Sequence, residues 1–362
     1  MLYTFFRNII LSLIFFLPQN AIWAQKANPS HFSLNQIYWD NDLILPRLQN
    51  EENRGVAGAF SGILSNNLIV AGGTNFPNLM PWEGGKKKWW DTLYLYPLKK
   101  KKAKWRISAK ALPHPIAYGV SIQLENGILC IGGCDSTQCY CDVFMISMEK
   151  HKINISTDWP SLPIPLANAC GTLIDGKIYI IGGQKETKNA TATSTFLMLD
   201  IKNKQKGWQV LPAWPGGPRG YAVCAVTKST LFLFSGRNYE NDRIIEVYKD
   251  GFEYNILTNK WNAISGDFPF MAGTAISFDN NNFIIMGGVS QILPTTIAHP
   301  GFSHAIRLFD VEQKAITEVL EIRQSIPVTT NILRKDNTIY VTSGEIKPGI
   351  RSPFILRGTI TK

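Results

Sequence analysis

The stretch Gly344-Glu-Ile-Lys-Pro-Gly-Ile-Arg351 places a glutamate and an arginine six residues apart, on either side of a Pro-Gly turn. A carboxylate on a rigid turn can accept and return a proton, which is the basis of general acid–base catalysis. The planar guanidinium of an arginine can pair with the carboxylate of a ligand. Glu345 and Arg351 are therefore the candidate catalytic residues. The alternative for Glu345 is an ordinary solvated loop glutamate.

Four further polar residues are candidates for binding a small anionic or polyhydroxylated ligand. Arg219 and Arg237 stand at the two ends of one pair of apolar strands and could hold a carboxylate or an N-acyl group. An arginine at such a position can also brace neighbouring sheets, so both interpretations stay open. Asn75 and Lys86 could donate hydrogen bonds to a polyol.

These residues belong to a chain with an internal repeat. A short β-branched or aliphatic run ends in a Gly-Gly or Ser-Gly pair six times, every 50 to 60 residues. The pairs are 72–73, 132–133, 182–183, 235–236, 287–288 and 343–344. Each run is the second strand in a meander of short strands, which is the unit of a propeller blade. The sequence therefore predicts an all-β fold, a six-bladed β-propeller.

The sixth repeat is one strand short. It contains predicted strands over 328–333, 338–344 and 354–357, with no fourth strand after them. Residues 36–46 near the N-terminus have the pattern of a fourth strand. An N-terminal strand that completes the last blade would close the ring and remove two exposed sheet edges.

Strand polarity predicts which face carries the site. In a four-stranded antiparallel blade, the loops after the second strand emerge on the same face as the links between blades. The stretches after the six glycine pairs, with Glu345 and Arg351, share this face. The lysine cluster over 99–104 points to the other face.

Composition indicates one exported domain. The first 24 residues hold Arg7, an apolar run over 9–17 and an Ala-x-x-Ala ending at Ala24, which indicates a signal peptide cleaved near Ala24 and a periplasmic or secreted protein. The alternative is an uncleaved anchor. No other stretch is long and apolar enough to span a membrane, so residues 25–362 are expected to form a single propeller domain without a membrane span.

The chain carries a formal net charge of +10. A basic surface attracts anionic ligands in general, but no nucleic-acid module accompanies it. We therefore expect a small anionic partner and no nucleic acid.

The six cysteines leave three possibilities open. Cys134, Cys139 and Cys141 share one loop, where export favours a local disulfide, with free thiols or a metal site as alternatives. Cys130, Cys170 and Cys224 lie in apolar strands and are expected to fill the core. The five histidines lack the spacing of metal ligands, so no metal and no other cofactor are expected.

Two loops carry a resemblance to a known family. The repeats resemble Kelch motifs, with a tryptophan in the fourth strand at 105, 208 and 261. The stretch Gly73-Thr-Asn-Phe-Pro77, with Pro81-Trp-Glu-Gly-Gly-Lys-Lys87 downstream, resembles the N-acetylneuraminate epimerases, or sialic acid mutarotases, as does the stretch from Gly344 to Arg351. In better-known members the latter loop lies mid-chain. Its C-terminal place here is similar to the cyclically permuted branch of the family.

The resemblance implies an isomerase that interconverts the α and β anomers of free N-acetylneuraminate. Glu345 matches the family's proton acceptor, and Arg351 matches its second site residue. The alternative is a non-catalytic Kelch propeller that binds a glycan or a protein. A sialidase would carry repeated Ser-x-Asp-x-Gly-x-x-Trp boxes, and the sequence has none.

Overall fold

The structure is a computed structural model that describes residues 32–47, 51–100, 102–187, 191–240, 243–244 and 246–361. A compact unit begins at Ser33 and contains every described strand. The expected signal peptide, residues 1–24, lies outside the described residues. In the described part of the chain, no helix has the length and hydropathy needed to cross a bilayer.

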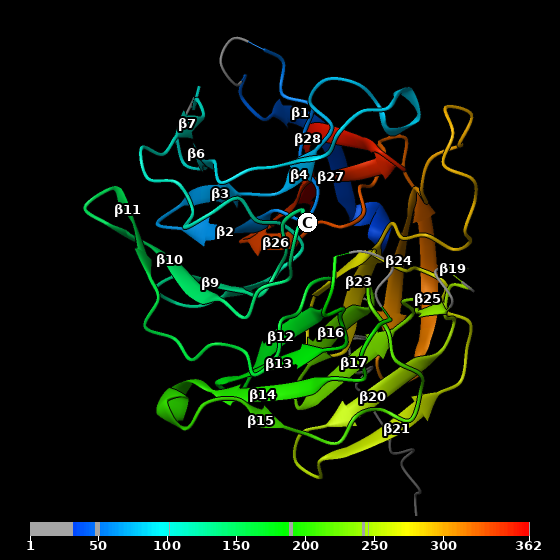
Figure 1. The fold of residues 1–362 in the computed structure, drawn as a ribbon. Coiled ribbons are helices and arrows are strands. Elements are labelled where there is room, and N and C mark those ends of the chain that lie inside the picture. Colours follow the sequence, from blue (N-terminus) through cyan, green and yellow to red (C-terminus); the bar gives the residue numbers. More distant parts are fainter. Residues whose placement is uncertain are drawn as a thin grey trace, which may run out of the picture. The chain divides into compact units, whose positions relative to one another are not determined.

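The described strands form six four-stranded antiparallel sheets, each a meander (Figure 1). Blade one contains β2 (Phe60–Leu64), β3 (Asn67–Ala71), β6 (Leu93–Pro97) and β7 (Arg106–Ile107). Blade two contains β8 (Val120–Gln123), β9 (Ile128–Ile131), β10 (Val143–Glu149) and β11 (Lys152–Ser156). Blade three contains β12 (Cys170–Ile174), β13 (Lys177–Ile181), β14 (Phe196–Asp200) and β15 (Gln209–Val210).

The second half of the ring follows the same order. Blade four contains β16 (Val223–Thr227), β17 (Thr230–Phe234), β20 (Gly251–Asn255) and β21 (Lys260–Ile264). Blade five contains β22 (Thr274–Ser277), β23 (Asn282–Met286), β24 (Ala305–Asp310) and β25 (Ala315–Glu321). Blade six contains β26 (Ile332–Lys335), β27 (Thr338–Lys347), β28 (Ile350–Ile360) and β1 (Ile37–Ile44).

The connecting segments hold short ribbons and 3₁₀ turns. The ribbons are β4 (Thr74–Asn75) with β5 (Lys88–Trp89), and β18 (Tyr239–Glu240) with β19 (Arg243–Ile244). The 3₁₀ turns are η1 (Leu34–Gln36), η2 (Pro81–Glu83) and η3 (Ile201–Lys206).

The N-terminal strand completes blade six, as the sequence predicts. β1 pairs with β28 along its length and forms the outer edge of that sheet (Figure 1). Asp40 lies opposite Arg357 in the register, and its Oδ2 is 2.9 Å from the arginine Nη2. The two strands are therefore joined by an ion pair as well as by the backbone ladder.

The innermost strands of the six sheets form a closed circle. β2 contacts β8, β8 contacts β12, β12 contacts β16, β16 contacts β22, β22 contacts β26, and β26 contacts β2. The observed fold is a six-bladed β-propeller, which confirms the prediction. In this order blade six lies opposite blade three, because two blades lie between them in either direction.

The blades pack against one another through their faces, so the second strands are apolar on both sides. β9, for example, is buried throughout. Between blades four and five, the core contains six phenylalanines, at 232, 234, 268, 270, 283 and 309. Burial of each large apolar side chain stabilises the fold by about 1.5–3 kcal/mol. This interblade core holds the strand ends at the centre of the ring in fixed positions.

A ring of six backbone hydrogen bonds closes the centre, and we call its members the inner ring. Two or three positions before each innermost strand, a residue donates its N–H to the carbonyl of its counterpart in the preceding blade, at 2.7 to 3.0 Å. The members are Gly58, Tyr118, Asn168, Tyr221, Ala272 and Thr329, all with φ between 49° and 66°. A left-handed backbone is costly for the five that are not glycine. The repeated hydrogen bond offsets that cost.

Candidate active site

The residue that follows each glycine pair occupies an equivalent place in all six blades, and we call these residues the outer ring. Each exchanges two backbone hydrogen bonds of 2.8 to 3.2 Å with the residue before an inner-ring member. The outer ring consists of Thr74, Cys134, Gln184, Arg237, Val289 and Glu345. The repeat therefore places Glu345 and Arg237 at corresponding positions on one face, in blades six and four.

The position before Glu345 requires a glycine for steric reasons. Gly344 has φ of 121°, and a Cβ there would lie 2.8 Å from the carbonyl oxygen of Val328. Because Val328 is the partner that fixes the Glu345 backbone, a side chain at 344 would break this pairing. The glycine thus positions the glutamate that follows it.

Glu345 and Arg351 face each other across a hairpin. The sequence predicted a loop here, but β27 continues to Lys347 and β28 begins at Ile350, so the two residues are direct cross-strand partners. Arg351 Nη1 lies 3.0 Å from Glu345 Oε1, and the Gly349 N–H donates to the same oxygen at 2.8 Å. Both contacts use Oε1, and among the described residues Oε2 has no hydrogen-bond partner.

The blade-one loop covers this hairpin. Phe76 lies under the Arg351 guanidinium at 5.0 Å, and Gly349 packs so closely on Pro81 that a Cβ would lie 2.5 Å from that ring. The two stretches that carry the family resemblance are therefore in contact. Arg351 is only 3% exposed, and its Nε has no acceptor. Its Nη1 contact with Glu345 is a short ion pair without hydrogen-bond alignment.

His299 lies close enough to the hairpin to feel the charges of Lys347 and Glu345, and no sequence pattern predicts this position. The Phe302 N–H donates to Ile346 O at 3.2 Å, which holds the blade-five loop against β27. His299 Nδ1 accepts the Gly301 N–H at 3.0 Å. Burial lowers the pKa of His299, and the charge of Lys347 lowers it further. Among the described residues, no cluster of potential metal ligands includes this histidine.

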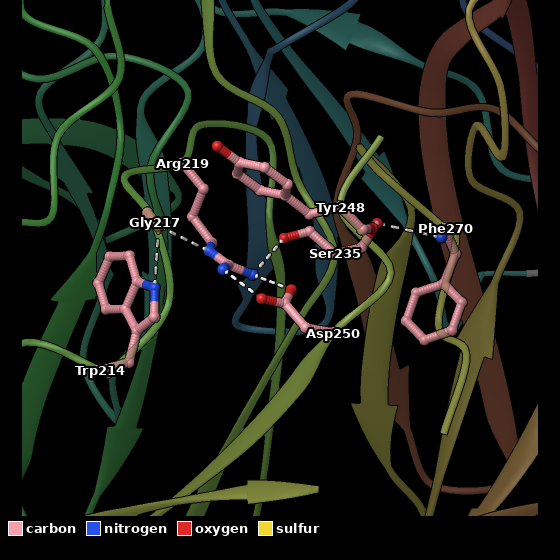
Figure 2. A network of polar contacts seen from close by, with 7 residues as sticks. All are labelled: Trp214, Gly217, Arg219, Ser235, Tyr248, Asp250 and Phe270. Atoms are coloured by element: carbon pink, nitrogen blue, oxygen red, sulfur yellow. Dashed lines mark hydrogen bonds and ion pairs between the residues drawn. The ribbon is translucent and has the colours of Figure 1, made fainter. Parts of the chain in front are cut away.

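Arg219 is part of a buried network (Figure 2). Its guanidinium is 0% exposed and makes two hydrogen bonds to Asp250, at 2.6 and 2.8 Å. It also donates to the Ser235 carbonyl at 2.9 Å and lies 4.9 Å from the ring of Tyr248. These contacts favour the bracing role that the sequence left open. The Arg219 guanidinium is therefore occupied by groups of the protein itself.

Arg237 has the opposite environment. Its guanidinium lies between two aromatic rings, 4.5 Å from Tyr221 and 4.6 Å from Tyr239. Its Nε is buried without an acceptor. No ion pair to Arg237 occurs among the described residues. A cation that is held by aromatic faces, with no described carboxylate against it, is available to an anionic ligand.

Asn75 and Lys86 have different surroundings: Asn75 lines the same cavity as Arg351, and Lys86 does not line it. Asn75 is buried, and its side chain donates to Gly55 O and accepts from Trp90 Nε1. Lys86 is exposed. Its neighbour Lys87 instead reaches the inner ring, with Nζ 4.7 Å from the centre of the Tyr118 ring. No signal in the sequence distinguishes Lys87 from Lys86, because both precede β5.

The cysteine loop is closed without a covalent bond. All six cysteines are free thiols, so the favoured local disulfide is not formed. Cys134 and Cys139 are backbone bridge partners, and Asp135 organises the turn between them. Burial acts to raise the pKa of Asp135, but hydrogen bonds from Tyr140 and Thr137 outweigh it and hold the pKa at about 2. Backbone pairing and this carboxylate make a disulfide unnecessary for the loop's shape.

A family model described as N-acetylneuraminate epimerase matches residues 21–155 and 159–299. Relatives with that name include proteins from Escherichia coli (strain K12) and Shigella flexneri serotype 5b (strain 8401), each 31% identical over 147 residues, 40% of this chain. The matched part spans only 38% of either relative's length. The hairpin of Glu345 and Arg351 lies beyond the residues matched by the family model.

The solved structure of YjhT is similar to this fold, with a TM-score of 0.63 and 16% sequence identity. The similarity covers 88% of this chain and 99% of that chain. At this identity the likeness concerns the fold alone.

Proposed function

The chain belongs to the N-acetylneuraminate epimerase family, and we propose that it interconverts the α and β anomers of free N-acetylneuraminate by opening and reclosing the sugar ring. The observation that supports this most directly is the Glu345–Arg351 hairpin, which begins at the outer ring. It offers a carboxylate held in place through one oxygen, with the other oxygen available for proton transfer.

The chemistry needs one proton to leave and one to arrive. Glu345 accepts the proton of the anomeric hydroxyl while the bond from the anomeric carbon to the ring oxygen breaks, and the ring oxygen takes up a proton from a solvent water molecule. The open-chain ketone then rotates and recloses on its other face, with the proton transfers reversed. A carboxylate that both accepts and returns the proton fits this symmetric sequence.

Arg351 positions the base in this scheme. It binds Glu345 Oε1 and is itself held over Phe76, so the carboxylate cannot rotate freely. A carboxylate restricted in this way presents Oε2 in one direction, which reduces the entropy lost on reaching the transition state. Since Arg351 is buried and already paired, it is poorly placed to hold the substrate as well.

We also propose that the protein acts outside the cytoplasm. This part of the proposal rests on the signal-peptide pattern of residues 1–24 alone. In that location the enzyme would equilibrate the anomers of the free sugar acid.

The test of the activity is an NMR time course of freshly released α-N-acetylneuraminate, with and without the protein. We expect the β-anomer signals to grow faster when the protein is present. Equal rates would overturn the proposed activity and leave the non-catalytic binding propeller as the alternative.

A further inference from the structure

Two tyrosines of the inner ring each have a cationic side chain packed against the aromatic ring. Lys87 Nζ lies 4.7 Å from the centre of the Tyr118 ring, in blade two, and 5.2 Å from Trp89. The Arg237 guanidinium lies 4.5 Å from the Tyr221 ring, in blade four. The backbone hydrogen bonds of the inner ring place Asn168 of blade three between these tyrosines. One arc of the ring therefore presents a cation, an amide and a second cation.

Neither cation has a carboxylate partner in the part of the chain that the structure describes. No ion pair involves Lys87 or Arg237 within the described ranges, whereas Arg219 is matched by Asp250 and Arg351 by Glu345. Arg237 Nε is a buried donor without an acceptor. Placing positive charge and an unused donor in a partly buried site costs free energy unless a ligand supplies the missing group.

The remaining blades present no competing charge at the same level. Blade five contributes Ala272 and Val289, and blade one contributes Gly58 and Thr74. Glu345 belongs to blade six, which lies opposite blade three in the ring. The two cations lie on either side of blade three, Lys87 against Tyr118 of blade two and Arg237 against Tyr221 of blade four. The two sides of the ring therefore differ: Glu345 lies on one side, and the two cations lie on the opposite side.

We infer that Arg237 and Lys87 form an anion seat for the carboxylate of the substrate, an inference that rests on the proposed function for the identity of that substrate. Arg237 supplies the planar pair of N–H donors, and Lys87 supplies a second positive charge from the other side of Asn168. In a 2-keto sugar acid the carboxylate is bonded to the anomeric carbon. Fixing the carboxylate therefore also fixes the anomeric hydroxyl relative to Glu345.

The test measures binding, so that it is independent of turnover. Calorimetric titration gives the Kd of N-acetylneuraminate and of its uncharged methyl ester for the protein and its variants. For Arg237→Met we expect the Kd of the acid to rise about 10-fold or more and the Kd of the ester to change less than about 3-fold, because only the acid offers a charged acceptor to the guanidinium. For Lys87→Met we expect a rise of about 5-fold for the acid alone.

Two controls match these changes. Lys88→Met removes a neighbouring lysine that lies 4.0 Å from Trp90, and Arg334→Met removes an arginine that lies 4.6 Å from Phe278. Both should bind the acid as the unaltered protein does. Arg237→Lys should recover part of the affinity, since it keeps the charge and loses the fork. Thermal melting verifies that each variant is folded.

The outcomes separate the seat from the activity. If Arg237→Met and Lys87→Met weaken the acid and the ester equally, or change neither, the anion seat is wrong. If the unaltered protein fails to speed anomerisation but binds the acid better than the ester through Arg237, the seat stands and the proposed activity fails.

Discussion

Blade four places an arginine in the outer ring and blade six places one opposite an outer-ring residue, and the two arginines differ in whether their charge is matched. Arg351 in blade six is buried and paired with Glu345 at 3.0 Å. Arg237 in blade four lies between two tyrosines, with no carboxylate partner among the described residues. A matched cation can orient its partner, whereas an unmatched one can bind a ligand. Proximity to the site therefore does not by itself define a residue's role.

The largest expected effect comes from removing the base in blade six. Glu345→Gln should lower kcat by about 10²–10⁴-fold, the range for loss of a general acid–base group, while the Kd of N-acetylneuraminate changes little. An NMR time course of the two anomers gives the rate, and calorimetry gives the Kd. Full activity in this variant would show that the base is elsewhere.

Removing the matched arginine should have a smaller effect of the same kind. Arg351→Met should reduce kcat by about 10–100-fold with less change in Kd, because a misplaced carboxylate loses part of the orientation effect. Arg351→Lys should recover some of the rate. A variant that raises KM and leaves kcat unchanged would instead make Arg351 a substrate-binding residue and would break the contrast with Arg237.

Replacing Asp250 tests whether Arg219 of blade four has a structural role alone. Asp250→Asn leaves Arg219, which is 0% exposed, without its charged partner, so the free energy of unfolding should fall by about 1–3 kcal/mol. Urea denaturation measures this change. Below the melting temperature, anomerisation should stay close to that of the unaltered protein. A large loss of rate in fully folded protein would mean that the Arg219 network also serves the site.

The smallest effect is expected from removing the aromatic ring of Tyr239, which packs against Arg237. Tyr239→Leu should raise the Kd of the sugar acid about 2–5-fold, since an exposed cation–π contact contributes about 0.5–1 kcal/mol. Tyr239→Phe keeps the ring and should bind as the unaltered protein does. Equal weakening by both changes would indicate that the hydroxyl, and not the ring face, matters.

The sequence predicted much of the architecture because its signals are local and repeated. The glycine pairs identified the blades, strand polarity identified the face, and residues 36–46 identified the closing strand, β1. The prediction of a loop at Glu345 was wrong in detail, because β27 and β28 continue into a hairpin that only cross-strand pairing reveals.

The sequence alone determined that Glu345 and Arg351 lie together after the last glycine pair, because a short turn keeps them adjacent. It could not separate Arg219 from Arg237, or Lys87 from Lys86. Only the tertiary structure distinguishes the members of each pair, since the availability of a cation to a ligand depends on which groups other segments bring to it. Asp250 neutralises Arg219, whereas Tyr221 and Tyr239 hold Arg237 without neutralising it. Charge compensation across a propeller is a long-range property, and sequence spacing does not encode it.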